Sequence, residues 1–190
     1  VKSESSYGTD AFGGSVPSEW LAVLGEPELM EDTTERGPEE NTADGLGGHV
    51  LMTRNMTEVS FETFLVGKES AAGDPPPVLD ELLKACNMAE TINAGTDVQY
   101  DVAFGRDMTS VPSMTVYEAI RDEVSGDYYV RLVTGVRGVL TLRLQDGQDA
   151  RLAFEGNGLY SELDTSTTSI TLPTQYSGDK GPIKVQGMTL

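Results

Sequence analysis

Histidine and cysteine, which often carry nucleophilic or acid–base catalysis near neutral pH, occur once each in this chain. A Ser-His-Asp or Cys-His site would have to use His49, which follows a glycine-rich run at 45–48. No Gly-x-Ser-x-Gly motif accompanies it, and the glycines lack the spacing of a phosphate-binding loop. Cys86 alone excludes an internal disulfide and a multi-cysteine zinc site. We interpret His49 as a loop residue without a chemical role and Cys86 as a buried thiol.

Carboxylates are abundant, but their spacing selects no site. Asp146 and Asp149 lack the series of oxygen ligands that an EF-hand needs. Glu118, Glu123 and Asp101 have the chemistry of an acid/base pair, yet no sequence spacing brings them together, so solvation on strand faces is the default interpretation. We therefore predict no catalytic, cofactor-binding or metal-binding residue, and we expect that the protein is not an enzyme.

The composition limits the classes of partner. The chain has 190 residues and a formal net charge of -18, with 31 acidic against 13 basic residues. Such a charge argues against general affinity for nucleic acid, which requires Lys and Arg to displace counterions, and against binding to anionic membranes. No apolar run approaches the roughly 18 residues of a membrane span, and residues 1–6 contain no apolar signal-peptide core. We expect synthesis in the cytoplasm.

The elements that would position any site divide into two regions within one structural domain. Residues 1–56 lack regular patterning and are predicted to form an N-terminal arm with an acidic loop. Residues 26–44 hold eight acidic residues against one basic residue, which favours a solvated loop; the alternative is an arm that orders only on a partner's surface. Trp20, at the head of a short apolar run, is the expected anchor of this arm.

Residues 57–190 are predicted to form the folded domain, with strands, one helix and long loops. Val59, Phe61, Thr63 and Leu65 alternate with polar residues, as do Val98, Tyr100, Val102 and Phe104, and Met114, Val116 and Ile120. Apolar residues at helical spacing predict a helix near 77–87 that ends at Asn87. Strands 139–144 and 150–155 are expected to form a hairpin through an Asp-Gly turn. The prediction is a mainly β fold, a β-sandwich or barrel with one packed helix.

Several short segments, in this order, resemble the tail tube (major tail) proteins of long-tailed bacteriophages. That family often shows a "P-x-L-D-x-L-L-x-A-C-G-x-x-E-T" helix, then a Gly-Thr with a "V-x-Y" strand, an "S-x-T-x-Y" strand, a "G-x-R-G-x-x-x-L" hairpin and an "F-x-G-x-G-x-Y" turn. The corresponding segments here are 76–91, 95–100, 113–117, 135–142 and 154–160, and residues 7–10 resemble a common opening of these proteins. Asn87 replaces the usual glycine, and the acidic stretch has no counterpart that we can align.

The resemblance implies a virion structural protein. Its subunits form rings, usually hexamers, that stack into a hollow tube through which the genome is ejected into the host. The implied partners are other copies of the chain, the terminator, tape measure and distal tail proteins, and phage DNA that passes through the lumen without specific binding. No membrane partner is expected, and the protein would be assembled in the host cytoplasm into the virion tail. The candidate assembly residues are Tyr7, Gly8, Thr9, Asp10, Trp20, Gly47, Gly48, His49 and Arg137.

Two other interpretations stay open at this point. The chain is alternatively a related virion part, such as a tail terminator or a neck or head component, which would not stack repeatedly into long tubes. It is otherwise an acidic β-sandwich binding module or an enzyme that uses carboxylates, either of which would be a stable monomer with a defined ligand pocket.

Overall fold

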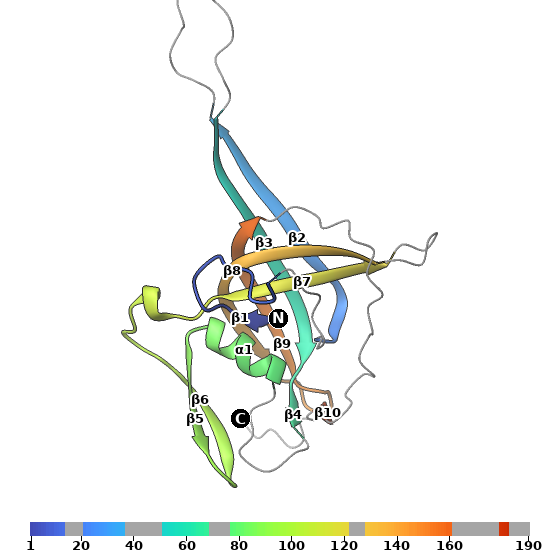
Figure 1. The fold of residues 1–190 in the computed structure, drawn as a ribbon. Coiled ribbons are helices and arrows are strands. Elements are labelled where there is room, and N and C mark those ends of the chain that lie inside the picture. Colours follow the sequence, from blue (N-terminus) through green and yellow to red (C-terminus); the bar gives the residue numbers. More distant parts are fainter. Residues whose placement is uncertain (14–20, 37–50, 69–76, 122–127, 161–178, 183–190) are drawn as a thin grey trace, which may run out of the picture.

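A computed structural model shows a mainly β protein built from antiparallel sheets (Figure 1). It describes residues 1–13, 21–36, 51–68, 77–121, 128–160 and 179–182. The largest sheet has the strand order β1-β7-β8-β9-β3-β2, and β4 pairs with β10 and β5 with β6 in two smaller sheets. The elements are β1 (Lys2–Ser3), β2 (Val23–Arg36), β3 (Leu51–Phe64), β4 (Val66–Lys68), α1 (Pro77–Ala85), β5 (Met88–Asn93), β6 (Asp97–Val102), a 3-10 turn (Met108–Ser110), β7 (Met114–Arg121), β8 (Tyr128–Arg143), β9 (Arg151–Tyr160) and β10 (Asp179–Pro182).

One face of the large sheet, here called the inner face, carries the hydrophobic core. On β3, Val59 and Phe61 are buried whereas Glu58 is exposed, which confirms the predicted alternation. Phe61 lies opposite Phe154 of β9, and the centroids of their rings are 5.1 Å apart. Burial of these large apolar side chains on one face fixes the register, because a slip by one residue would expose them all.

Helix α1 covers part of the inner face. Leu79 and Leu82 belong to the same buried cluster as the sheet residues around them, as the apolar stripe in the sequence predicted. Pro77 opens the helix, where its missing N–H costs nothing, and Asn87 has a φ of 62° just after the end. The predicted helix and its stop at Asn87 are confirmed, although the helix itself ends at Ala85.

The predicted acidic loop is wrong for the part of the segment that the structure describes. Residues 23–36 form β2, which pairs along its length with β3, and the expected boundary at residue 56 falls inside β3. The sequence pattern does not indicate this strand because β2 buries little beyond Leu29, while Glu26 and Glu28 are exposed. Few apolar residues are needed in a strand at the edge of a sheet.

The β2–β3 pair extends beyond the rest of the sheet. Pairing between β3 and β9 begins at Met56, so residues 33–36 and 51–55 form a two-stranded ribbon with no further strand beside it in the described part of the chain. Figure 1 shows this ribbon projecting away from the body of the molecule. We refer to residues 33–36 and 51–55 as the ribbon.

The predicted β8–β9 hairpin is present. Leu140 lies opposite Phe154 and Leu142 opposite Leu152, and Gly147 takes a φ of +77° in the connecting turn. Leu142 is nevertheless 50% exposed, because no described element covers this end of the hairpin. Phe104 also departs from expectation: β6 ends at Val102, and Phe104 lies in the following turn with 92% of its surface exposed.

Candidate functional site

Glycines at three positions allow β8 and β9 to approach closely beneath an aromatic ring. A Cβ placed on Gly138 would lie 2.3 Å from the carbonyl oxygen of Glu155 and 2.7 Å from the Phe154 ring, and one on Gly156 would lie 2.6 Å from that ring. A Cβ on Gly158 would lie 2.5 Å from a methyl group of Val133. The glycines of segments 135–142 and 154–160 thus have a structural role, since the Phe154 side chain lies over Gly138 and Gly156.

A second cluster forms where residues 1–13, here called the N-terminal strap, lie against β7 and β8. The carboxylate of Glu4 is its centre and accepts four hydrogen bonds. Two come from the backbone N–H groups of Gly8 and Gly135, at 2.8 and 2.7 Å, and two from the hydroxyl groups of Ser113 and Thr115, at 2.7 and 2.8 Å. Gly135 takes a φ of +66° in a β-bulge of β8. This bulge lets its N–H reach Glu4.

Several predicted assembly residues meet in this strap. The guanidinium of Arg137 lies 4.9 Å from the centre of the Tyr7 ring, and the Tyr7 ring also packs against Gly135. Asp10 accepts a hydrogen bond of 3.0 Å from the hydroxyl of Tyr117. The contact between Arg137 and Tyr7 is a cation–π pair, and the Asp10 carboxylate is hydrogen-bonded to Tyr117. Both contacts hold the strap to its own chain.

The remaining predicted candidates divide into two groups. Gly8 lies in the strap close to Leu159, and exposed Thr9 donates its backbone N–H to Ser6 within a turn. Trp20, Gly47, Gly48 and His49 lie outside the residues that the structure describes. Sequence reasoning missed Glu4, because the groups that it binds at Ser113, Thr115 and Gly135 lie more than one hundred positions away and no local motif marks them.

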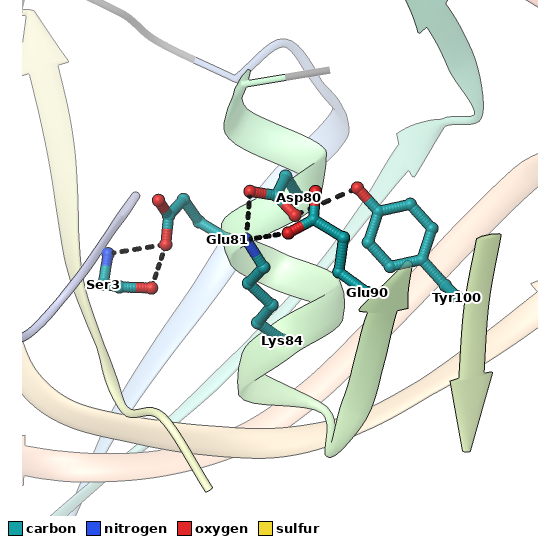
Figure 2. Close-up of polar contacts among 6 residues, drawn as sticks. All are labelled: Ser3, Asp80, Glu81, Lys84, Glu90 and Tyr100. Carbon is teal, nitrogen blue, oxygen red and sulfur yellow. Dashed lines mark hydrogen bonds and ion pairs between the residues drawn. The ribbon is translucent and has the colours of Figure 1, made fainter. Parts of the chain in front are cut away.

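A third cluster joins α1 to the β5–β6 hairpin (Figure 2). Lys84 contacts Asp80 and Glu90, each at 2.7 Å, and the Tyr100 hydroxyl donates to Asp80 at 3.0 Å. Burial lowers the pKa of Lys84, but the two carboxylates outweigh it and leave that pKa raised. Burial, followed by the bond to Asp80, raises the pKa of Tyr100. With both pKa values raised, Lys84 stays charged and Tyr100 neutral near neutral pH, and the contacts fix the hairpin to the helix.

Glu81 extends this helix surface toward the strap. Its carboxylate accepts hydrogen bonds from the backbone N–H and the hydroxyl of Ser3, as Figure 2 shows. Burial and then the neighbouring Asp80 raise the pKa of Glu81. This contact holds β1 to α1, in addition to the strand pairing that holds β1 to β7.

The carboxylates considered for acid/base chemistry are not gathered into a site. Glu118 pairs with Arg131 at 3.4 Å, and burial raises its pKa while that arginine lowers it. Arg131 also donates to the carbonyl oxygen of Leu29 on β2 at 3.1 Å. Asp101 is exposed on β6, and Glu123 lies outside the described residues. Within the described residues, no group of three or more His, Cys, Asp or Glu side chains is arranged to hold a metal ion.

The face of the sheet opposite the core, here called the outer face, is hollowed by a groove with acidic side chains. Cross-strand pairing places Glu28, Ser60, Glu155 and Val139 in one row and Met30, Glu58, Asn157 and Arg137 in the next. Opposed residues of an antiparallel sheet share a face, and these two rows line a groove of about 470 Å³. Its rim carries three carboxylates and a single guanidinium, that of Arg137. The groove therefore disfavours phosphate and other anions.

Cys86 is half-buried, and burial raises the pKa of its thiol to about 12. Alkylation by iodoacetamide near pH 8 should therefore be roughly 1,000-fold slower than for an unperturbed thiol, because the thiolate is the nucleophile. Labelling should speed up with rising pH, and also in denaturant, where the thiol regains its ordinary pKa.

Above about pH 8.5 the raised pKa of the Cys86 thiol should also reduce the stability of the fold, since only the unfolded thiol ionises there. If Cys86 is labelled as fast in the native protein as in the denatured protein, the raised pKa of its thiol would be contradicted.

Comparison with models of known protein families gives no match to this chain, and comparison with curated proteins gives none either. Among the described residues, none of the helical segments has the length and apolar character needed to cross a membrane.

Proposed function

We propose that this chain is a tail tube subunit of a long-tailed bacteriophage, a virion structural protein and not an enzyme. The observation that carries the proposal is the joint occurrence of tail-tube-like motifs and an antiparallel sheet whose edge strands, within the described residues, are open on one side. Three features of the molecule support it: the sheet edges, the acidic groove of the outer face and the projecting ribbon. The finer description of the fold, a tail-tube-like β-sandwich, belongs to the same proposal.

The two edges of the large sheet offer complementary surfaces for other copies. Along the described chain, β2 pairs only with β3, and β1 covers only the first two residues of β7, Met114 and Thr115. Unpaired N–H and C=O groups on such strands are templates for another strand. When the edge of one copy pairs with the opposite edge of the next, the contact is head-to-tail and closes a ring if the rotation allows. The resemblance gives the ring number, usually six.

The outer face suits the wall of a conduit for DNA. Glu28, Glu58 and Glu155 project from three adjacent strands, and the whole chain carries a net charge of -18. In a closed ring with this face turned inward, the carboxylates would repel phosphate groups, so DNA would pass without being held. The inner face, covered by α1, would then point away from the lumen.

The ribbon supports contact between successive rings. An isolated two-stranded ribbon is marginally stable in water, so its residues gain most from packing against another surface. It projects beyond the sheet in Figure 1. Within the proposal, the ribbon contacts a neighbouring ring, and the other tail proteins meet the first and last rings of the tube. Those partners are the terminator, tape measure and distal tail proteins, and the site of action is the virion tail after assembly in the host cytoplasm.

Salt-dependent sedimentation tests the proposal. A subunit with a net charge of -18 repels its copies at low ionic strength, and salt screens that repulsion. Raising salt at high protein concentration should shift the protein from a slow species to rings and then to much faster, polydisperse tubes. A discrete ring that never elongates would favour the tail terminator or neck assignment. A monomer at every salt and protein concentration would contradict assembly and favour an acidic binding module.

A further inference from the structure

The N-terminal strap is held to the sheet by many polar contacts, with apolar contacts from Val1 and Phe12. None of residues 1–13 is fully buried, and Tyr7 is 55% exposed. Beneath the strap, Ser113 and Thr115 are buried, yet their hydroxyl groups bond to the Glu4 carboxylate, which they would exchange for water if the strap left. A polar, partly exposed attachment of this kind opens at much lower cost than the apolar core.

The strap also lies at the sheet edge that the proposed ring contact would use. Lys2 pairs with Thr115 and Ser3 with Met114, so β1 occupies the first positions of the β7 edge. An incoming strand of the length of β2, 14 residues, would meet β1 before it could pair along all of β7. Asp10 and Phe12 contact Tyr117, a few residues further along β7.

We propose that the N-terminal strap is a latch that restrains assembly by occupying the β7 edge, and that Glu4 is the residue that holds the strap in place. This inference rests on the proposed function, because it assumes that a second copy of the chain pairs with β7. While Glu4 holds Gly8, Ser113, Thr115 and Gly135, the strap stays on its own sheet. When the strap leaves, β7 offers its whole length to the neighbouring copy.

The chemistry of Glu4 makes the latch sensitive to one substitution. One carboxylate oxygen faces the Gly8 N–H and the other faces the Gly135 N–H. In Glu4→Gln, the amide nitrogen must replace one of these oxygens, and it then faces a backbone N–H that cannot accept a hydrogen bond. Whichever way the amide turns, the strap loses at least one charge-assisted bond and gains a repulsive contact.

The test compares Glu4→Gln with Glu155→Gln in the full chain. Both variants remove one negative charge, but Glu155 lies exposed on the outer face of β9, so it controls for reduced self-repulsion. Critical concentration is measured by sedimentation, and the products are examined by electron microscopy. Hydrogen exchange of residues 1–13 and 114–121 in the monomer reports the release of the strap. We expect Glu4→Gln to assemble at a concentration about tenfold or more below that of Glu155→Gln, the loss of roughly one charge-assisted hydrogen bond.

The outcomes separate the latch from the proposed function. If the wild type forms tubes and Glu4→Gln assembles no more readily than Glu155→Gln despite faster exchange in the strap, the latch is wrong and the tube assignment stands. If neither the wild type nor the variants assemble, although hydrogen exchange shows that the strap is released in Glu4→Gln, the latch and the tube assignment are both wrong. Should Glu4→Gln fail to fold, Tyr117→Phe removes the bond to Asp10 but keeps the ring against Phe12. It should then lower the critical concentration, and an unchanged value would overturn the latch.

Discussion

Removing the ribbon should leave rings that no longer stack. The variant joins Asp32 to Met56, which are cross-strand partners, through an Asn-Gly turn. It keeps every pair between β3 and β9, because that pairing begins at Met56, so the sheet and both of its edges are retained. If the ribbon makes the main contact between rings, the concentration needed for stacking should rise by about 100-fold or more, which corresponds to about 2.8 kcal/mol or more. Analytical ultracentrifugation and negative-stain images measure it.

Ring formation is the internal control for the ribbon deletion. The deletion variant should have nearly the same melting temperature as the wild type and should form rings at a similar concentration. Tubes of ordinary length from the shortened chain would show that the ribbon does not connect rings. Loss of rings as well as tubes would instead place the ribbon in the contact between neighbours within a ring.

Gly138→Ala should produce a large loss of stability for the addition of a single methyl group. The added Cβ would lie 2.3 Å from the Glu155 carbonyl oxygen and 2.7 Å from the Phe154 ring, and neither the backbone nor a fully buried ring moves easily. Overpacking of this kind should lower the free energy of unfolding by about 3 kcal/mol. In a chain of this size the melting temperature of the monomer should fall by about 9 °C, measured by circular dichroism at low protein concentration.

Gly95→Asn provides the matched control. Gly95 also has a special backbone conformation, with φ at +78°, but nothing lies within 4 Å of the position of its Cβ. Asparagine tolerates the left-handed region, so this variant should change the free energy of unfolding by less than about 1 kcal/mol. Equal effects of Gly138→Ala and Gly95→Asn would show that contact between β8 and β9 does not explain the glycines of the motifs.

Local pattern was sufficient to predict α1, β3 and the β8–β9 hairpin. Each is defined by residues close in sequence: an apolar stripe ending at Asn87, the alternation through Val59 and Phe61, and an Asp-Gly turn. The same approach failed for β2, because its acidic residues favour a loop whereas the strand needs only Leu29 in the core. Phe104 was placed in a strand because alternation continues past Val102, but the chain turns there instead.

The candidate site was predictable only in part. The resemblance directed attention to Tyr7, Asp10 and Arg137, and the structure places all three in or against the strap. Their contacts are intramolecular, with Tyr7 against Arg137 and Asp10 against Tyr117, which no local pattern could indicate. Glu4 was missed for the same reason, since its importance depends on a bulge at Gly135 that brings a distant N–H group toward it.

Negative-stain electron microscopy of the purified wild-type protein, concentrated at moderate salt, tests the central claim most directly. Screening the net charge of -18 removes the main barrier to association. The tail tube proposal predicts rings with a central channel, seen end-on, and hollow tubes of variable length, seen side-on. Small separate particles at every concentration, for the wild type and for Glu4→Gln alike, would contradict it.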